Sequence, residues 1–310
     1  MRRKNTRRLK LECNTFGREE RDPSQVLMKE KLKTFLGLVL LLFGAILCFS
    51  PTLSTNTLNW YTEKYIKKYD KTWNQTKPAS EKGNLYKQIQ DYNKAIHDNN
   101  QKGFCDAWSY TQIPIQLDGL KDNCYGYINI PKMDVKLPLY LGASEEHLKK
   151  GAAVLGETSI PIGGINSNSV IAGHRGYQGA PYFREIERLS VNDMVYITNP
   201  WEKLSYRVES IKIIEPFDND SVKIQPGKDM ITLITCHPYR SHGKYRYVVY
   251  CVRDDGTEIE KEQVVENSNT GITFESSEPD IRREEKFRKI GLLIIFLESI
   301  YVITKRRQNN

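Results

Sequence analysis

One uncharged run near the N-terminus constrains this chain more than any other feature. No charged residue occurs among the 29 positions Thr34–Thr62, and the run has its apolar centre at Phe35–Phe49. A helix needs about 20 such residues to cross the hydrocarbon core of a bilayer. The preceding residues 1–33 carry eleven Lys and Arg against five acids, and the positively charged flank of a membrane helix stays in the cytoplasm. We therefore predict a basic cytoplasmic tail over 1–33, an uncleaved membrane anchor over 34–57, and the remaining chain outside the cell.

Three other interpretations of this N-terminus fit the residues less well. A cleaved signal peptide has a much shorter basic region and a small-x-small cleavage site, and no clear site follows the run. Lipid attachment at Cys48 needs a small residue before the cysteine, where Leu47 stands. A basic tail can bind nucleic acid, but this tail leads directly into the apolar run. We therefore predict the lipid bilayer as its partner and no nucleic acid.

A second apolar run, Ile290–Thr304, lies near the C-terminus and contains Glu298. As a helix its 15 residues would extend roughly 22 Å, which is shorter than the ~30 Å hydrocarbon core. The flanking lysines can extend it by snorkelling, but basic residues crowd both ends, so the positive-inside rule gives conflicting signals. We predict a second membrane segment over 289–305, with a helix on the membrane surface as the alternative.

Between the two runs, a polar region precedes a β-rich one. Residues 58–121 have apolar residues at loose helical spacing, which predicts one or two stalk helices and then a loop that forms a lid. Over 122–256, segments rich in Val, Ile, Tyr and Thr alternate with turn residues, which indicates a mainly β barrel or sandwich with one short helix at about Tyr182–Leu189. Residues 257–288 are polar and predict a linker. The expected strands are Tyr125–Ile130, Val135–Tyr140, Ser169–Ala172, Met194–Thr198, Tyr206–Ile214, Met230–Thr235 and Tyr245–Val252.

Three residues at strand ends are candidates for nucleophilic chemistry. Cys236 ends one apolar strand, His174 lies between glycines after another, and Arg246 opens the strand that follows the cysteine. A thiol needs a basic or cationic partner to act as a nucleophile, and a guanidinium can stabilise an oxyanion. The alternative is a small buried thiol, a satisfied histidine and a solvated arginine. The residue types alone leave both interpretations open.

Ordered motifs around these residues resemble the sortase family. The segment Thr232-Leu-Ile-Thr-Cys236, the element Gly173-His-Arg-Gly176 and an arginine entering the next strand are similar to the sortase signature. Cys236-His-Pro-Tyr239 resembles the Cys-x-Pro-Tyr form of class C, the pilin-polymerising sortases of Gram-positive bacteria. The resemblance covers about residues 105–255. It implies a sortase-type eight-stranded β-barrel with short helices, preceded by a helical stalk and lid and flanked by membrane helices.

The resemblance also implies a role for each candidate. Cys236 would attack the Thr–Gly carbonyl of an LPxTG-like sorting signal and form a thioacyl enzyme. His174 would transfer protons to the leaving amine and from the incoming one. Arg246 would bind the substrate backbone and the oxyanion. The family implies no cofactor, and the ligand-type residues show no metal-site spacing, so we predict no metal.

The lid and the arginine each depart from the family pattern. Asp106 and Trp108 match the lid acid that pairs with the active-site arginine and the aromatic residue that covers the thiol. Ala107 stands where the family has proline, which predicts a less rigid lid because alanine leaves φ freer. Arg246 lies one residue later than in many class C sequences. Lys244 is the alternative cation, although it lacks the bidentate fork.

The other histidines and cysteines receive simpler interpretations. His237 adjoins the thiol, but consecutive strand residues point to opposite faces, so we assign it a structural or specificity role. His97 and His147 have polar helical neighbours and are predicted to be exposed. Cys105 and Cys124 flank the lid on the oxidising side, and a disulfide or two separate thiols both fit the sequence.

Three functions follow from these interpretations. The first is a membrane-anchored transpeptidase that transfers a pilin from its LPxTG-like signal to a pilin lysine amine. The second is a sortase that attaches surface proteins to cell-wall peptide. The third is a non-catalytic surface binding module in which Cys236 is structural. The lid residues favour the first, and all three place the main domain on the extracytoplasmic face of the cell membrane.

Overall fold

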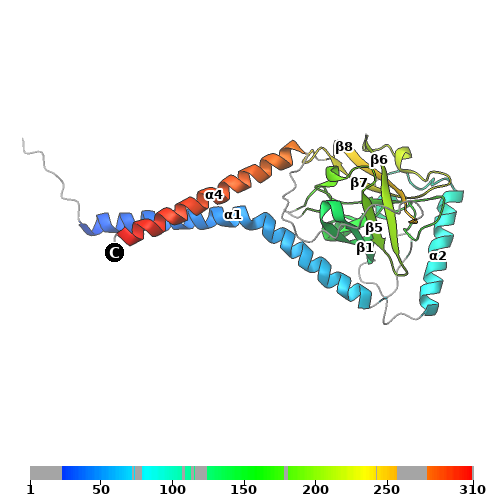
Figure 1. The fold of residues 1–310 in the computed structure, drawn as a ribbon, viewed down its shortest axis with the longest axis horizontal. Helices are drawn as coiled ribbons and strands as arrows, with labels where there is room; N and C mark the ends of the chain where they lie inside the picture. The colour runs from blue at the N-terminus through cyan, green and yellow to red at the C-terminus, as the bar shows by residue number, and fades with distance from the viewer. Residues whose placement is uncertain are drawn as a thin grey trace, which may run out of the picture. The chain divides into compact units, whose positions relative to one another are not determined.

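The computed structural model describes most of the chain. The described residues are 23–71, 73, 79–106, 109–112, 115, 124–177, 181–241, 243–256 and 278–308. They fall into two compact units. The larger, Cys48–Ile294, contains the β-rich region; the other is Met1–Leu47 with Ile295–Asn310. Two long helices, α1 (Pro23–Lys71) and α4 (Pro279–Gln308), each contribute to both units (Figure 1).

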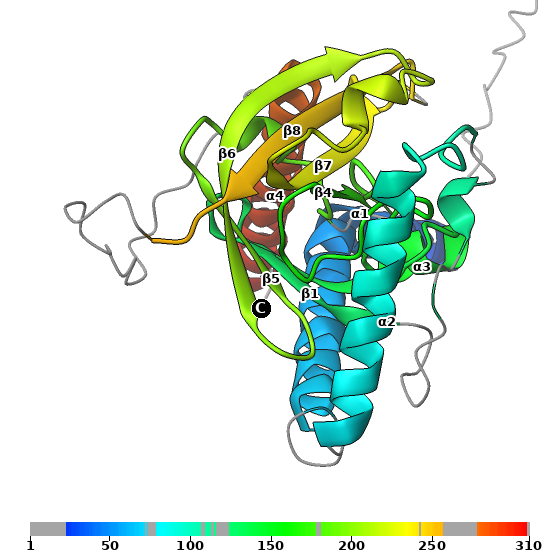
Figure 2. The ribbon, with the colours of Figure 1, turned by 90° about the vertical axis from the view of Figure 1, so that its right-hand side faces the viewer.

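Eight strands close into a barrel in the order β1-β2-β3-β4-β7-β8-β6-β5, which confirms the predicted eight-stranded, mainly β fold. The pairs β2–β3 and β4–β7 are parallel. The other pairs are antiparallel, and β6, β8 and β7 lie side by side in Figure 2. The strands are β1 (Cys124–Ile130), β2 (Val135–Leu141), β3 (Ala152–Val154), β4 (Ser167–Ala172), β5 (Met194–Thr198), β6 (Lys203–Ile214), β7 (Asp229–His237) and β8 (Tyr245–Arg253).

Short helices fill some of the connections, and the one that the sequence predicts is shorter than expected. The α-helix α3 (Glu145–Lys150) begins with Ser144, whose side chain accepts a hydrogen bond from the backbone of His147. The expected helix over Tyr182–Leu189 is instead a turn followed by the 3-10 helix η5 (Ile186–Arg188). The described part of the chain also contains the 3-10 helices η2 (Ser109–Thr111), η4 (Pro131–Met133) and η6 (Asp220–Val222).

Successive residues of β7 alternate between two apolar cores, as the pleat of a strand requires. Ile231 and Leu233 pack in the larger core. Met230 and Ile234 pack in the smaller one, together with Phe104 from the segment that precedes the barrel. This alternation gives the end of β7 two distinct environments, one on each face.

The predicted stalk region contains the end of α1 and the helix α2 (Ala79–Asp98). Ile89 of α2 is fully buried in the larger core. The amide of Asn93 donates to the carbonyl oxygen of Ile160 at 2.9 Å and accepts from its backbone N–H at 2.8 Å. The hydroxyl of Tyr69, in α1, donates to the carbonyl oxygen of Tyr125 at 2.6 Å. These contacts fasten both helices to the barrel.

The predicted membrane segments are not confirmed by the structure. Within the described residues, no helix has both the length and the apolar character needed to cross a membrane. Helix α4 begins at Pro279, inside the predicted linker 257–288. The N-terminal part of the predicted tail, residues 1–22, and most of that linker lie outside the described residues.

Candidate active site

Cys236 and Arg246 face each other across two neighbouring strands. Cys236 lies near the end of β7, Arg246 near the start of β8, and the two are directly paired in the antiparallel register. Paired residues project from the same face of a sheet, and on β7 this is the face that carries Met230 and Ile234. The register therefore places the thiol and the guanidinium on one surface.

The turn between these strands leaves space beside both groups. Gly243 has φ +83°, and a Cβ built there would lie 2.6 Å from Nη1 of Arg246 and 3.3 Å from Sγ of Cys236. Glycine adopts this left-handed conformation without strain, and any side chain would collide with the guanidinium. The thiol and the guanidinium thus flank the space beside Gly243, which is open because glycine has no side chain.

The guanidinium of Arg246 is held in place by the turn. Its Nη1 donates to the carbonyl oxygens of Gly243 at 2.7 Å and Tyr245 at 3.2 Å. Among the described residues, no carboxylate forms an ion pair with it, so a substrate oxygen would meet a fixed, uncompensated cation. The alternative cation, Lys244, precedes β8 and its ammonium lies 5.4 Å from the ring centroid of Tyr245.

His174 reaches the same end of the barrel from the neighbouring strand. β4 and β7 are parallel and pair Ala172 with Ile234, so His174 and Cys236 are both two positions beyond that pair. Two bonds continue the alignment: the N–H of Gly173 donates to the carbonyl of Ile234 at 3.2 Å, and Thr235 Oγ1 donates to the carbonyl of Gly173 at 2.7 Å. The register of three strands therefore brings the three predicted residues to one end of the barrel.

Aromatic side chains enclose the imidazole of His174. Its ring stacks on Tyr177 with centroids 4.9 Å apart and meets the edge of Tyr182 at 6.2 Å. Its Nε2 is buried and has no hydrogen-bond partner in the described part of the chain. Burial lowers the pKa of His174; the charge of Glu145 opposes this and that of Lys149 adds to it. The ring is therefore neutral at neutral pH and keeps a free nitrogen for proton transfer.

The segment that carries the predicted lid lies against the same surface, but its acid has a different partner. Asp106 is exposed, and its carboxylate accepts the backbone N–H of Ser109 at 2.8 Å, at the start of η2. No described contact pairs Asp106 with Arg246. Tyr110 senses both charges: burial raises its pKa, the hydrogen bond with Asn219 and the charge of Arg246 lower it, and the charge of Asp106 raises it. Trp108, the other predicted lid residue, lies outside the described residues.

Three comparisons identify the family. The sortase domain matches residues 128–254. Sortase A of Bacillus anthracis is 30% identical over 167 residues, which are 52% of this chain and 76% of that protein. The chain belongs to the sortase family. Sortase C of Clostridium perfringens, solved with the C-terminal cell wall sorting motif, is 34% identical with a TM-score of 0.54 over 62% of this chain and 98% of that one.

A second solved structure agrees with the assignment to class C. The pilus-related sortase C of Group B Streptococcus is 30% identical, with a TM-score of 0.53 over 60% of this sortase and 95% of that chain. These structural neighbours are class C sortases, as the Cys-x-Pro-Tyr motif predicts. Sortases are cysteine transpeptidases of the Gram-positive cell surface, and this chain has the family's domain.

The structure of this sortase corrects the prediction for His147 and decides between the two alternatives for Cys105 and Cys124. His147 is buried rather than exposed, because its Nδ1 lies 2.7 Å from the carbonyl oxygen of Gly142 and its ring stacks on Tyr140. The possible Cys105–Cys124 disulfide is not formed, and Cys236 and Cys251 are not bridged either.

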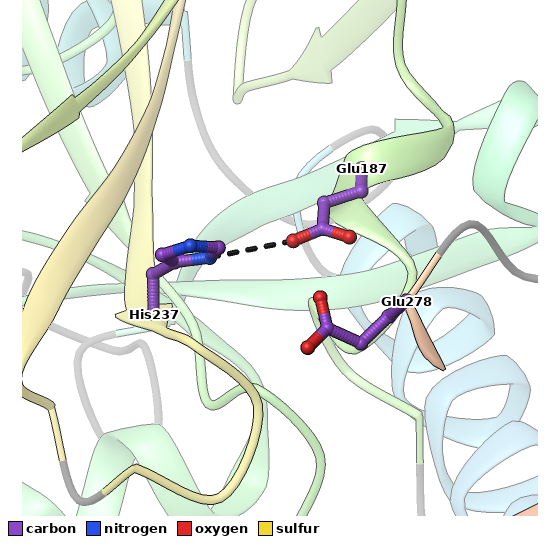
Figure 3. A group of neighbouring side chains, drawn as sticks. All are labelled: Glu187, His237 and Glu278. Atoms are coloured by element: carbon purple, nitrogen blue, oxygen red, sulfur yellow. Dashed lines mark ion pairs between the residues drawn. The ribbon is translucent and has the colours of Figure 1, made fainter. Parts of the chain in front are cut away.

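The structure also assembles a group of side chains that no sequence pattern singles out. Glu187, His237 and Glu278 come together, with one ligand-type atom of each within 4.8 Å of the others (Figure 3). The sequence analysis predicts no metal because the ligand-type residues show no metal-site spacing, and this grouping in space leaves that a prediction. Their separation along the chain hides the cluster from any analysis of local spacing. The sequence motifs also give no indication that Tyr110, Tyr177 and Tyr182 lie near the site, because an isolated tyrosine belongs to no recognisable motif.

Proposed function

We propose that this sortase is a cysteine transpeptidase of pilus assembly. Its substrate is a pilin with a C-terminal LPxTG-like signal, which it cleaves between Thr and Gly and transfers to a pilin lysine amine. The observation that carries the proposal is the register that pairs Cys236 with Arg246 and aligns His174 with them. A thiol, a proton carrier and a fixed cation at one place are the parts that acyl transfer through a thioester requires.

In the first half-reaction, the sulfur of Cys236 forms a bond to the Thr carbonyl carbon while the thiol proton passes to the neutral ring of His174. The carbonyl oxygen becomes an oxyanion, which the guanidinium of Arg246 stabilises. Collapse of this intermediate breaks the C–N bond to Gly, and the imidazolium gives its proton to the leaving amine. The products are a thioacyl enzyme and the released C-terminal segment.

In the second half-reaction, the lysine amine attacks the thioester and loses a proton to the ring of His174. The new C–N bond forms, the C–S bond breaks, and the sulfur of Cys236 recovers a proton. The aromatic side chains Tyr177 and Tyr182 around the ring favour this path over hydrolysis because they limit access of water.

The comparisons and the N-terminal sequence support the proposed partners. The Clostridium perfringens sortase C was solved with a cell wall sorting motif, which supports a sorting-signal substrate. The pilus-related streptococcal neighbour supports a pilin acceptor. The uncharged run over 34–57 supports attachment to the lipid bilayer, with the barrel on the extracytoplasmic face.

Mass spectrometry of the full chain tests the proposed reaction. After incubation with an LPxTG-type peptide, we expect a mass increase equal to the peptide fragment that ends in Thr, located on the peptide that contains Cys236. Addition of a pilin with its acceptor lysine is expected to remove this mass and yield an isopeptide. Transfer to a cell-wall peptide amine instead would assign the second function, and the absence of any adduct would favour a binding module.

Loss of the lid acid is expected to expose the thiol. Asp106→Ala removes the acceptor of the Ser109 N–H, and a loss of about 1 kcal/mol of lid closure would speed alkylation of Cys236 about fivefold. Trp108→Ala is expected to have an effect in the same direction. The measurement is the rate of iodoacetamide labelling of Cys236, followed by mass spectrometry.

Two further variants interpret this result. Asp106→Asn keeps an acceptor for the Ser109 N–H but removes the charge, so it separates capping from a charge effect on Arg246. Asp255→Ala, at an acid that pairs with Arg253 beyond the other end of β8, is the control and should label at the wild-type rate. Equal labelling of all variants and the wild type would remove the lid from the proposal.

A further inference from the structure

The cluster of Glu187, His237 and Glu278 resembles a cation site, but the protein supplies the cation itself. Arg175 projects its guanidinium between the two acids and the ring. Nη2 donates to Glu187 at 2.5 Å and to Glu278 at 3.4 Å, and Nη1 lies 3.1 Å from Nδ1 of His237. The arginine side chain is only 3% exposed. A metal ion would have to share this buried space with a permanent positive charge, so we assign the acids to Arg175.

The protonation states agree with this assignment. Burial raises the pKa of Glu187, but the hydrogen bonds from Arg175 and Glu278 and the charge of Arg175 outweigh it and lower the pKa overall. Burial raises the pKa of Glu278, and the neighbouring Glu187 adds to this. Burial and the charge of Arg175 lower the pKa of His237, and Glu187 opposes this. Nδ1 of His237 also lies 3.3 Å from a carboxylate oxygen of Glu187, the pair that the dashed line in Figure 3 marks.

The residues around the guanidinium of Arg175 include immediate neighbours of the proposed catalytic residues in the chain. Arg175, His237 and Tyr247 each directly follow one of the three. The guanidinium of Arg175 lies 5.6 Å from the ring centroid of Tyr247, and Nη1 donates to the carbonyl oxygen of Cys236 at 3.3 Å. His237 and Tyr247 belong to β7 and β8, where consecutive residues point to opposite faces. Arg175 therefore connects the ends of β4, β7 and β8 behind the face that carries the thiol.

The C-terminal segment completes the cluster. Glu278 directly precedes α4 and is 8% exposed. Further along the chain, in α4, Glu284 accepts a hydrogen bond from the hydroxyl of Tyr239 at 3.0 Å and pairs with Arg240. Both partners lie in the loop that directly follows β7. Helix α4 thus contacts two residues that follow Cys236 in the chain, Tyr239 and Arg240.

We propose that Arg175 is a positioning residue for acyl transfer and that Glu278 makes the C-terminal segment part of the active site. By holding three strand ends together, Arg175 fixes the distances between the thiol, the imidazole and the guanidinium. A displacement of about 1 Å in a reacting group can cost roughly 100-fold in rate. Glu278 restrains the guanidinium of Arg175 by accepting a hydrogen bond from Nη2. This inference rests on the proposed function, because acyl transfer is its main readout.

The first test is Arg175→Lys in the full chain. Lysine keeps the positive charge between the acids but cannot donate to Cys236, His237 and both carboxylates together. We expect kcat for acyl transfer to fall roughly 10- to 100-fold, with KM changed by less than about twofold. Thermal unfolding checks that the variant is folded. An unchanged kcat with a lowered Tm would mean that Arg175 only stabilises the fold.

The second test addresses the C-terminal segment. Glu278→Gln keeps the shape of the side chain and weakens its hydrogen bond to Arg175, and we expect kcat to fall roughly three- to tenfold. Asp280→Asn is the matched control, because Asp280 is half exposed and pairs with Arg283 on its own helix. Equal kcat values for the two variants would overturn the role of Glu278.

A readout without substrate separates this inference from the proposed function. Alkylation of Cys236 at pH 7 depends on the placement of its charged neighbours, so Arg175→Lys should change its rate by at least about threefold. An unchanged alkylation rate would overturn the positioning role even if transfer is never detected. If the wild type forms no acyl enzyme but the alkylation rate changes, the proposed function fails and the positioning role stands.

Discussion

Cys236→Ala is expected to lower the rate of acyl transfer at least ~10³-fold, since the thioester route is lost with the sulfur. His174→Ala should cause a loss of similar size, because without the ring no group takes the thiol proton. The measurement is the single-turnover rate of cleavage of an LPxTG-type peptide at saturating enzyme. Cys105→Ser is the control, because Cys105 is an exposed thiol outside the paired register.

The double variant Cys236→Ala/His174→Ala distinguishes a catalytic unit from two separate contributions. Residues that act together are strongly non-additive, so the double variant should be no slower than Cys236→Ala alone. A further large loss from His174→Ala in the alanine background would show that the ring acts without the sulfur. That outcome would contradict the proton transfer between them.

Arg246→Ala is expected to reduce kcat roughly 10²- to 10³-fold, since it removes the cation that faces the developing oxyanion. Arg246→Lys should recover only part of this loss. The guanidinium is fixed by bonds from one nitrogen to two turn carbonyls, which leaves the rest of its planar fork for the substrate. An ammonium on a flexible stem lacks that geometry.

Lys244→Ala is the matched control for the arginine, because Lys244 was the competing cation in the sequence. Its ammonium contacts the ring of Tyr245, so we expect less than about a twofold change in kcat. A larger loss from Lys244→Ala than from Arg246→Ala would reverse the assignment. Comparison of kcat with KM shows whether either residue acts in binding or in the transition state.

The local pattern of the chain predicted most strands of the barrel well, because these strands are long enough to show their composition. β7 and β8, with nine residues each, were placed within two residues at either end. β3 has three residues, too few to display a period, and the pattern alone did not reveal it. The helix expected over Tyr182–Leu189 is mostly a turn, and only Ile186–Arg188 form a short 3-10 helix.

The site was predictable where motifs mark it and hidden where only the fold brings residues together. Cys236, His174 and Arg246 stand in recognisable segments, and strand register then places them at one end of the barrel. His147 was predicted to be exposed from its helical neighbours, but its partners Tyr140 and Gly142 lie at the end of β2. Such contacts leave no mark on the local sequence.

The contacts of Arg175 behind the site were even harder to predict from the local sequence. Arg175 meets Glu278 across 103 positions of the chain, and neither residue stands in a pattern that suggests a partner. Buried ion pairs of this kind are recognised only from the folded structure, because their cost and their gain depend on every surrounding group.

The position of Glu278 in the chain has a consequence for biosynthesis. Ribosomes make the thiol, the imidazole and the arginine first, and Glu278 follows more than thirty residues after Arg246. During this interval a nascent polypeptide has all three groups but lacks the acid that braces Arg175. With the positioning role proposed for Glu278, full transfer activity arises only after Glu278 has been added to the chain. A nascent chain that has not reached Glu278 is therefore expected to form the acyl enzyme roughly three- to tenfold more slowly than the full chain.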